Sequence, residues 1–366
     1  MHAVEAMSSS ARFFGGFFSR NKFTNDDKMS KSLANHSPIN LGVVPTHLTF
    51  ADGIAPTQNG DWPRDESGQI KILSYFRQLV AEAPVSIDCA QISQFAGTSD
   101  EANTELVDGL KALGLEVQFI MMVGEGDPMN PADEDTVVQM LVDGLNTAQK
   151  YGVSQVSSTS LEAWMSGGKP KTGDEFKAAV DQLVRLHDRA YQEAGIEDSC
   201  IEAWHLEFLR SVEFQTFTDL GKAWDLVKAM NENLGKPFYK LLVDAAHCGD
   251  SSLSVEENQR LIAEIGAAGA LGSFHCSAKT TRGCLSTDDG WVGALLTAAT
   301  QTGTLTHVFV EVFHHQDTAL APLREAVAGH GVDTTDGRSY DQVVVDGLID
   351  TVRRLNNLCQ RGILAR

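Results

Sequence analysis

The chain has 366 residues, of which 42% are hydrophobic, so it is long enough for one large domain or two small ones. Its 49 acidic residues outnumber its 29 basic residues, which gives a formal net charge of −20. This balance argues against nucleic acid or an anionic membrane as a partner, because binding phosphate groups requires clustered Lys and Arg. A divalent cation or a neutral polyol is compatible with it.

The first 37 residues differ from the rest of the chain. They are rich in Ser, Asn and Lys and lack apolar periodicity, which predicts a disordered or loosely attached N-terminal extension over 1–37. The six cysteines show no CxxC spacing, and several lie in strand-like runs, so we expect free thiols and a cytoplasmic location. No apolar run reaches the length of about 18 residues that a membrane span needs.

Residues 38–366 repeat one pattern, in which a short apolar run is followed by a polar loop and an amphipathic helix. The predicted strands are Ile39–Val44, Val85–Ile92, Glu116–Val123 and Val153–Ser157, with four more near Ile201, Tyr239, Ser273 and His307. Helices are predicted at 68–82, from 98–101 onward, at 137–145, 220–233, 255–268 and 291–300, and a last one within 339–366.

Eight strands separated by roughly 30 to 50 residues predict eight βα units that close into one (β/α)8 TIM barrel over 38–366. A doubly wound open sheet is the alternative. That fold usually carries a Gly-rich phosphate loop after its first strand, and no such loop is present here. The barrel is therefore the preferred prediction.

Acidic or histidine side chains end the last four predicted strands, at Glu207, Asp244, His275 and Glu311. A buried Asp after the apolar run 241–243 is costly unless a positive charge compensates it. The carboxyl ends of the strands form the active site of a TIM barrel, so these four side chains predict a metal site there. Three carboxylates and one imidazole suit a divalent ion with two octahedral positions left open, with Mn²⁺ expected first and Mg²⁺, Co²⁺ or Zn²⁺ as alternatives.

Such a site predicts enolisation chemistry. Two oxygens of a polyol or ketose would fill the open positions, and a metal-bound carbonyl would acidify the neighbouring C–H. Glu207 and Glu311 are the expected proton-transfer groups, acting through an enediolate. His247 lies one helical turn after Asp244 and is expected to bind substrate. Arg282, in the loop after His275, is expected either to hold a substrate oxygen or to lie at the surface.

The ordered set resembles the sugar isomerase/epimerase superfamily with its xylose-isomerase-like barrel, and within it most closely the ketose 3-epimerase branch. That family has a metal-binding Glu followed six residues later by a substrate-binding Glu, then a metal-binding Asp and substrate-binding His in Asp-x-x-His, a metal-binding His and a metal-binding Glu. The matching positions are Glu207 and Glu213, Asp244 and His247, His275, and Glu311.

The resemblance implies a metal-dependent isomerase or epimerase that acts on a small sugar or polyol and that could form a homo-oligomer. The family's substrate-binding Arg stands six residues after the metal-binding His, whereas Arg282 stands seven after His275. A lyase or dehydratase on the same site is the alternative, of the inosose dehydratase, sugar-acid lyase or C-glycoside lyase kind. An apurinic endonuclease needs extra histidines on strands two and three, which the sequence lacks. A non-catalytic sugar-binding barrel is a third alternative.

Overall fold

The computed structural model describes residues 31–46, 55–277, 290–312 and 338–364, together with Ala321 and Glu325. Most of the predicted extension, residues 1–30, lies outside the described residues. Residues 31–37 contact the rest of the chain. The Asn356 side chain donates to the Ala34 carbonyl and accepts from the His36 N–H, both at 2.8 Å, which ties this segment to the C-terminal helix. In the part of the chain that the structure describes, no helix is both long and apolar enough to cross a membrane.

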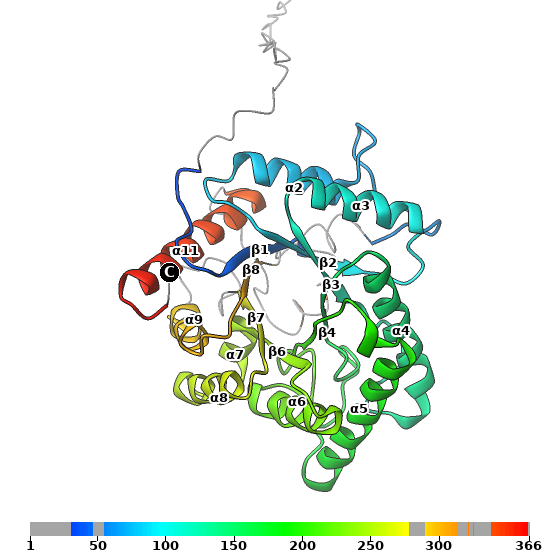
Figure 1. Cartoon of the computed structure of the whole chain (residues 1–366). Coiled ribbons are helices and arrows are strands. Elements are labelled where there is room, and N and C mark those ends of the chain that lie inside the picture. The colour runs from blue at the N-terminus through cyan, green and yellow to red at the C-terminus, as the bar shows by residue number, and fades with distance from the viewer. Residues whose placement is uncertain are drawn as a thin grey trace, which may run out of the picture.

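Eight parallel strands form a closed barrel in which each pairs with its sequence neighbours and the first pairs with the last (Figure 1). They are β1 (Asn40–Val44), β2 (Cys89–Gln94), β3 (Glu116–Met121), β4 (Gln155–Ser158), β5 (Ala203–Leu206), β6 (Tyr239–Asp244), β7 (Leu271–Cys276) and β8 (His307–Glu311). The predicted (β/α)8 fold is confirmed. The second strand begins at Cys89 rather than Val85, because residues 85–88 lead into the barrel without pairing as a strand.

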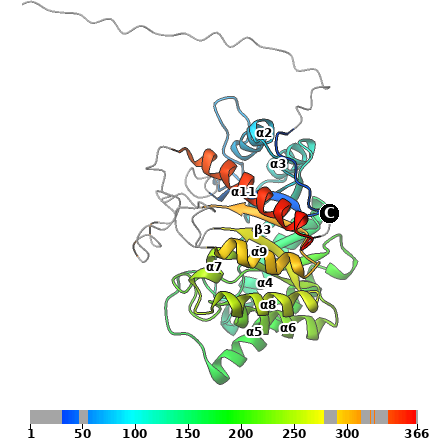
Figure 2. The same ribbon diagram turned by 90° about the vertical axis from the view of Figure 1, so that its left-hand side faces the viewer.

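Helices surround the strands in Figure 1. They are α2 (Lys71–Glu82), α3 (Asp100–Ala112), α4 (Glu134–Lys150), α5 (Gly173–Glu193), α6 (Leu220–Leu234), α8 (Val255–Ala267), α9 (Trp291–Gln301) and α11 (Tyr340–Gln360), with the short α7 (Ala245–Asp250), η1 (Pro131–Asp133) and η2 (Ile196–Asp198) between them. Buried apolar residues at helical spacing pack each long helix on the strands. The side view shows α11 beside α9 (Figure 2), where Gly293 lets the Arg354 guanidinium approach closely.

Two of these helices were not predicted. The buried face of α5 includes Gln182 and His187 among its apolar residues, which hides the apolar period. The helix α7 has six residues and starts directly after β6, where the Asp244 side chain accepts a hydrogen bond from the His247 N–H at 2.8 Å and so caps it. In the Asp-x-x-His sequence, Asp244 is therefore the N-cap of α7 and His247 is the third residue of that helix.

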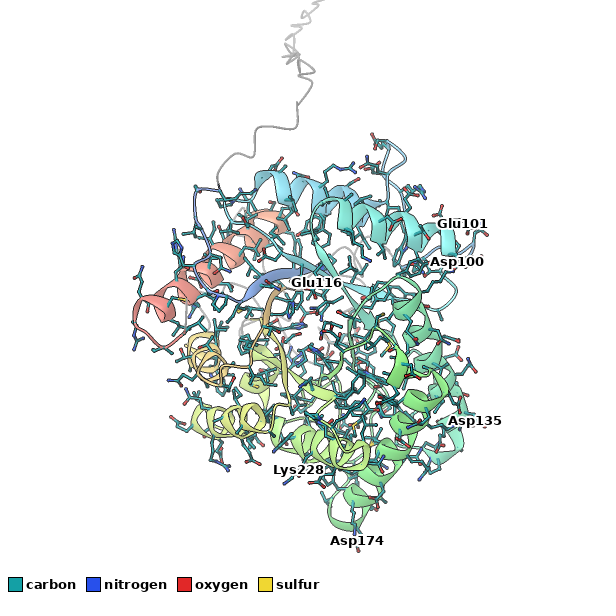
Figure 3. The ribbon with its side chains drawn as sticks, viewed as in Figure 1. Asp100, Glu101, Glu116, Asp135, Asp174 and Lys228 are labelled. Carbon is teal, nitrogen blue, oxygen red and sulfur yellow. The ribbon has the colours of Figure 1, made fainter. Side chains whose placement is uncertain are left out.

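Polar residues occupy the barrel interior in two layers that an aromatic ring separates. At the amino-terminal end, His307 Nε2 lies 3.0 Å from Glu116 Oε2. Figure 3 shows Glu116 within the ring of strands, whereas Asp100, Asp135 and Asp174 lie at the outer edge of the molecule. The Phe309 ring lies between His307 (6.2 Å between centroids) and His275 (5.9 Å). Gly42 makes room for this ring, because a Cβ there would lie 2.4 Å from it. The layer at the carboxyl-terminal end of the strands, which includes His275, is the candidate site.

Candidate functional site

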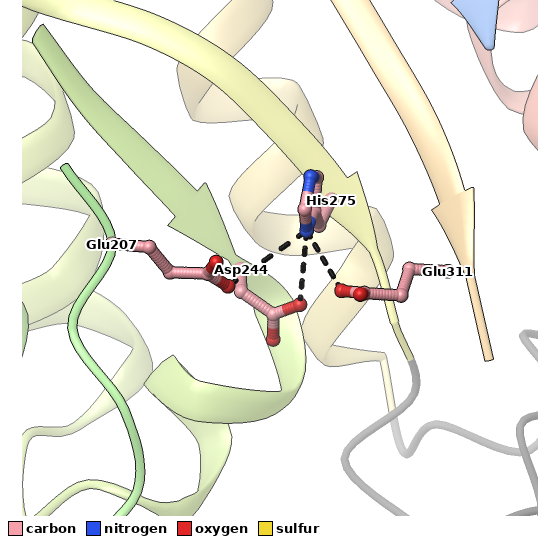
Figure 4. Close-up of side chains that lie close together, drawn as sticks. All are labelled: Glu207, Asp244, His275 and Glu311. Carbon is pink, nitrogen blue, oxygen red and sulfur yellow. Dashed lines mark hydrogen bonds and ion pairs between the residues drawn. The ribbon is translucent and has the colours of Figure 1, made fainter. Parts of the chain in front are cut away.

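The four predicted ligands converge at the carboxyl end of the barrel (Figure 4). Asp244 and Glu311 end β6 and β8, His275 lies one residue before the end of β7, and Glu207 follows β5. Since the strands are parallel, these positions share one end of the barrel. The candidate ligand atoms of Glu207, Asp244, His275 and Glu311 all lie within 4.8 Å of one another, and all four residues are buried.

The imidazole of His275 is the centre of the cluster. Its Nδ1 lies 2.8 Å from Glu311 Oε2 and 3.8 Å from both Asp244 Oδ2 and Glu207 Oε1. On the opposite side of the ring, Nε2 lies 2.8 Å from the amide oxygen of Gln91, a buried residue of β2. The amide oxygen can only accept a hydrogen bond, so Nε2 carries a proton and Nδ1 faces the carboxylates.

Burial and crowded negative charge shift the pKa values in this cluster. Burial, together with the Glu311 and Asp244 carboxylates, raises the pKa of Glu207 to about 8 against the opposing effect of the two histidines. Burial alone would lower the pKa of His275, but the Glu311, Glu207 and Asp244 carboxylates outweigh it and raise that pKa to about 9. Protons on Glu207 and His275 therefore offset negative charge that a bound cation would offset instead. Three carboxylates and one imidazole in this arrangement fit a divalent ion.

His247 and Glu213 lie beside the cluster. His247 Nδ1 lies 2.9 Å from the Phe208 carbonyl oxygen and 3.4 Å from Glu207 Oε1. Burial lowers the pKa of His247, but the carboxylates of Asp244, Glu207 and Glu213 outweigh this and raise it. Glu213 is half-buried, and burial raises its pKa while the neighbouring His247 lowers it. The structure therefore brings both predicted substrate-binding residues to the same end of the barrel as the four ligands.

No protein-family model and no curated protein matches the sequence. Solved structures do resemble the fold. A D-allulose 3-epimerase from Methylomonas sp. matches with a TM-score of 0.63 at 15% sequence identity, over 88% of this chain and 100% of that chain. A D-psicose 3-epimerase from Clostridium cellulolyticum H10 matches with a TM-score of 0.61 at 16% identity, over 87% of this chain and 99% of that chain.

The chain has the closed (β/α)8 barrel fold of these two structures. A family 2 AP endonuclease from Brucella melitensis also resembles it, with a TM-score of 0.50 at 16% identity, over 72% of this chain and 95% of that chain. At such low identities the likeness defines the fold and leaves the reaction to be argued from the site.

Gln91 is a site residue that sequence reasoning missed. It is 1% exposed and lies at the third position of β2, where its side chain reaches His275 across the barrel interior. The signal for it in the sequence is a glutamine in each of the strands β2 and β3. Gln91 and Gln118 pair in register, and both are buried. Buried amides in neighbouring strands of a barrel indicate polar partners inside it.

Arg282, the predicted substrate-binding arginine, lies outside the described residues. The Trp62 side chain belongs to the core, because it is 2% exposed, donates its indole N–H to Asn103 Oδ1 at 3.3 Å and packs against Phe95.

Proposed function

We propose that this protein is a divalent-metal-dependent isomerase or epimerase of a sugar or polyol. The observation that carries the proposal is the buried set of Glu207, Asp244, His275 and Glu311, whose ligand atoms lie within 4.8 Å of one another at the active-site end of the barrel. The likeness to solved ketose 3-epimerases agrees with it. Mn²⁺ is the proposed ion, because carboxylate-rich sites with imidazole suit it.

The proposed roles follow from the positions of the side chains. A divalent ion at this site would supply the positive charge that acidifies a C–H bond beside a substrate carbonyl. Glu207 follows β5 and Glu311 ends β8, and the two lie on either side of His275 in Figure 4. One would remove a proton from one face of the substrate carbon, and the other would return a proton to the opposite face. His247 and Glu213 would hold neighbouring hydroxyls, and Arg282 remains a predicted substrate contact.

An endonuclease is disfavoured on the site, although the fold permits it. The described strands β2 and β3 contain no histidine, whereas an apurinic endonuclease needs histidines there. The net charge of −20 also opposes a phosphate backbone.

The proposal is tested with D-tagatose and D-allulose in deuterated buffer containing Mn²⁺, followed by proton NMR. An epimerase gives the epimeric ketose with solvent deuterium at the inverted carbon. A product that has lost water identifies the lyase or dehydratase alternative. Sugar binding without turnover, equal in Mn²⁺ and in chelator, would contradict the proposal and identify a sugar-binding barrel.

A further inference from the structure

Two loops at the active-site end of the barrel are joined by the carboxylate of Glu162. This residue lies in the loop that follows β4, is 5% exposed, and accepts three backbone hydrogen bonds from the loop that follows β5. Its Oε1 accepts from the Gln215 N–H at 2.9 Å, and its Oε2 accepts from the N–H groups of Thr216 (2.8 Å) and Phe217 (3.2 Å). Hydrogen bonds to a carboxylate are among the stronger ones in proteins. They hold the segment that directly follows Glu213.

The same two loops meet again at Glu213 itself. The Trp164 indole N–H donates to Glu213 Oε1 at 2.9 Å, and the Met165 N–H donates to the Glu213 carbonyl at 2.8 Å. Met165 has a φ of 51°, the only positive φ of a non-glycine residue in the described ranges. This conformation is strained for a residue with a side chain and persists only where surrounding contacts hold it. The bond to Glu213 is such a contact.

The start of the first loop is anchored to the barrel wall. The Trp204 indole of β5 donates to Ser158 Oγ at 2.8 Å, Ser158 and Ser160 share a 2.7 Å hydrogen bond, and Ser160 Oγ lies 2.8 Å from His187 Nε2 of α5. All four residues are buried. Glu162 follows two residues after Ser160, so it is attached to a fixed point rather than to a free loop.

We propose that Glu162 is a positioning residue that fixes the Glu213 carboxylate for substrate binding by holding residues 215–217 against the wall of the barrel. The part of this inference that concerns substrate rests on the proposed function. Glu162 is not among the four candidate ligands, so its effect should reach the substrate and not the metal. A merely structural brace would instead lower stability and leave Glu213 in place.

The test uses Glu162→Gln in the full chain, because the amide keeps the shape but turns one acceptor into a donor that faces backbone N–H groups. Without sugar, the Trp164 indole N–H resonance, assigned with Trp164→Phe, should move toward the position of a free indole. With Mn²⁺ and D-tagatose, KM should rise about tenfold or more, as expected for lost hydrogen bonds to a charged group. The Mn²⁺ affinity should stay at the wild-type value.

Glu134→Gln is the matched control. Glu134, at the start of α4, accepts from Gln182, Arg185 and Arg189 of α5, and its variant should leave the Trp164 resonance and KM unchanged. If Glu162→Gln does not fold, Glu162→Asp keeps the charge on a shorter side chain and should shift the same two quantities by less.

A double variant separates positioning from bracing. If Glu162 acts through Glu213, Glu162→Gln combined with Glu213→Gln should raise KM no further than Glu213→Gln alone. Additive losses, or an unchanged Trp164 resonance in Glu162→Gln, would overturn the inference. If the wild-type protein turned over no sugar, the proposed function would fail, and the indole resonance alone would decide whether Glu162 positions Glu213.

Discussion

Replacing Gln91 with Leu should weaken metal binding although Gln91 is not a candidate ligand. Its amide oxygen accepts from His275 Nε2 at 2.8 Å, and His275 is 1% exposed, so water cannot readily replace this partner. The bond keeps the proton on Nε2 and leaves Nδ1 for the ion. Without it, the metal-bound ring would bury an Nε2–H that has no acceptor and would lose the contact that keeps Nδ1 turned toward the ion. Loss of such an outer partner typically costs 10–100-fold in metal affinity, or about 1.4–2.7 kcal/mol.

The assay is titration of metal-free protein with Mn²⁺ by calorimetry, with nitrogen-detected NMR of the His275 ring as a second readout. Gln118→Leu is the control, because Gln118 pairs with Gln91 in register, is equally buried and bonds to Glu116 rather than to an imidazole. The Gln91 variant should bind Mn²⁺ at least about tenfold more weakly than this control. Equal affinities, with the Nε2–H tautomer intact in both, would refute the reasoning.

Three other predictions follow from the same cluster. Glu207→Gln and Glu311→Gln should each lower turnover by at least ~10²-fold, as for a lost general base, and near-normal steady-state rates in both would contradict the two-acid mechanism. His247→Ala should keep its metal by elemental analysis but lose about 1–3 kcal/mol in kcat/KM, whereas an unchanged value would remove it from substrate binding. Folding raises the pKa of His275 from 6.5 to about 9, so the associated stability is present below pH 6.5 and is lost as the pH rises to about 9 in metal-free protein. Mn²⁺ affinity should rise over the same range because the proton must leave, and a flat profile in calorimetry would contradict this.

The strands and the convergence of the four candidate ligands were predictable because each depends on local sequence. Apolar runs such as 241–243 end in Asp244, and in a parallel barrel the ends of such runs meet whatever the details of packing. The helix α5 was not predictable in this way, since its buried His187 bonds to Ser160 in the loop after β4, a partner known only from the fold. Gln91 was hidden for the same reason, as its partner His275 is 184 residues away in sequence.

The loops show the same limit. The family resemblance implies that Glu213 binds substrate, but nothing local predicts that Glu162 holds residues 215–217, which follow Glu213. Its carboxylate binds backbone N–H groups, which leave no mark on side-chain composition. Contacts of this kind decide how accurately a site is built, and they become visible only when both loops are placed.

The central claim is tested most directly by elemental analysis of protein loaded with Mn²⁺ and exchanged into metal-free buffer. Wild-type protein should retain near one ion per chain. His275→Ala should lose it, because the imidazole that the three carboxylates surround is gone, whereas Glu213→Gln should retain it. Equal metal content in wild-type protein and His275→Ala would contradict the assignment of this cluster as the metal site.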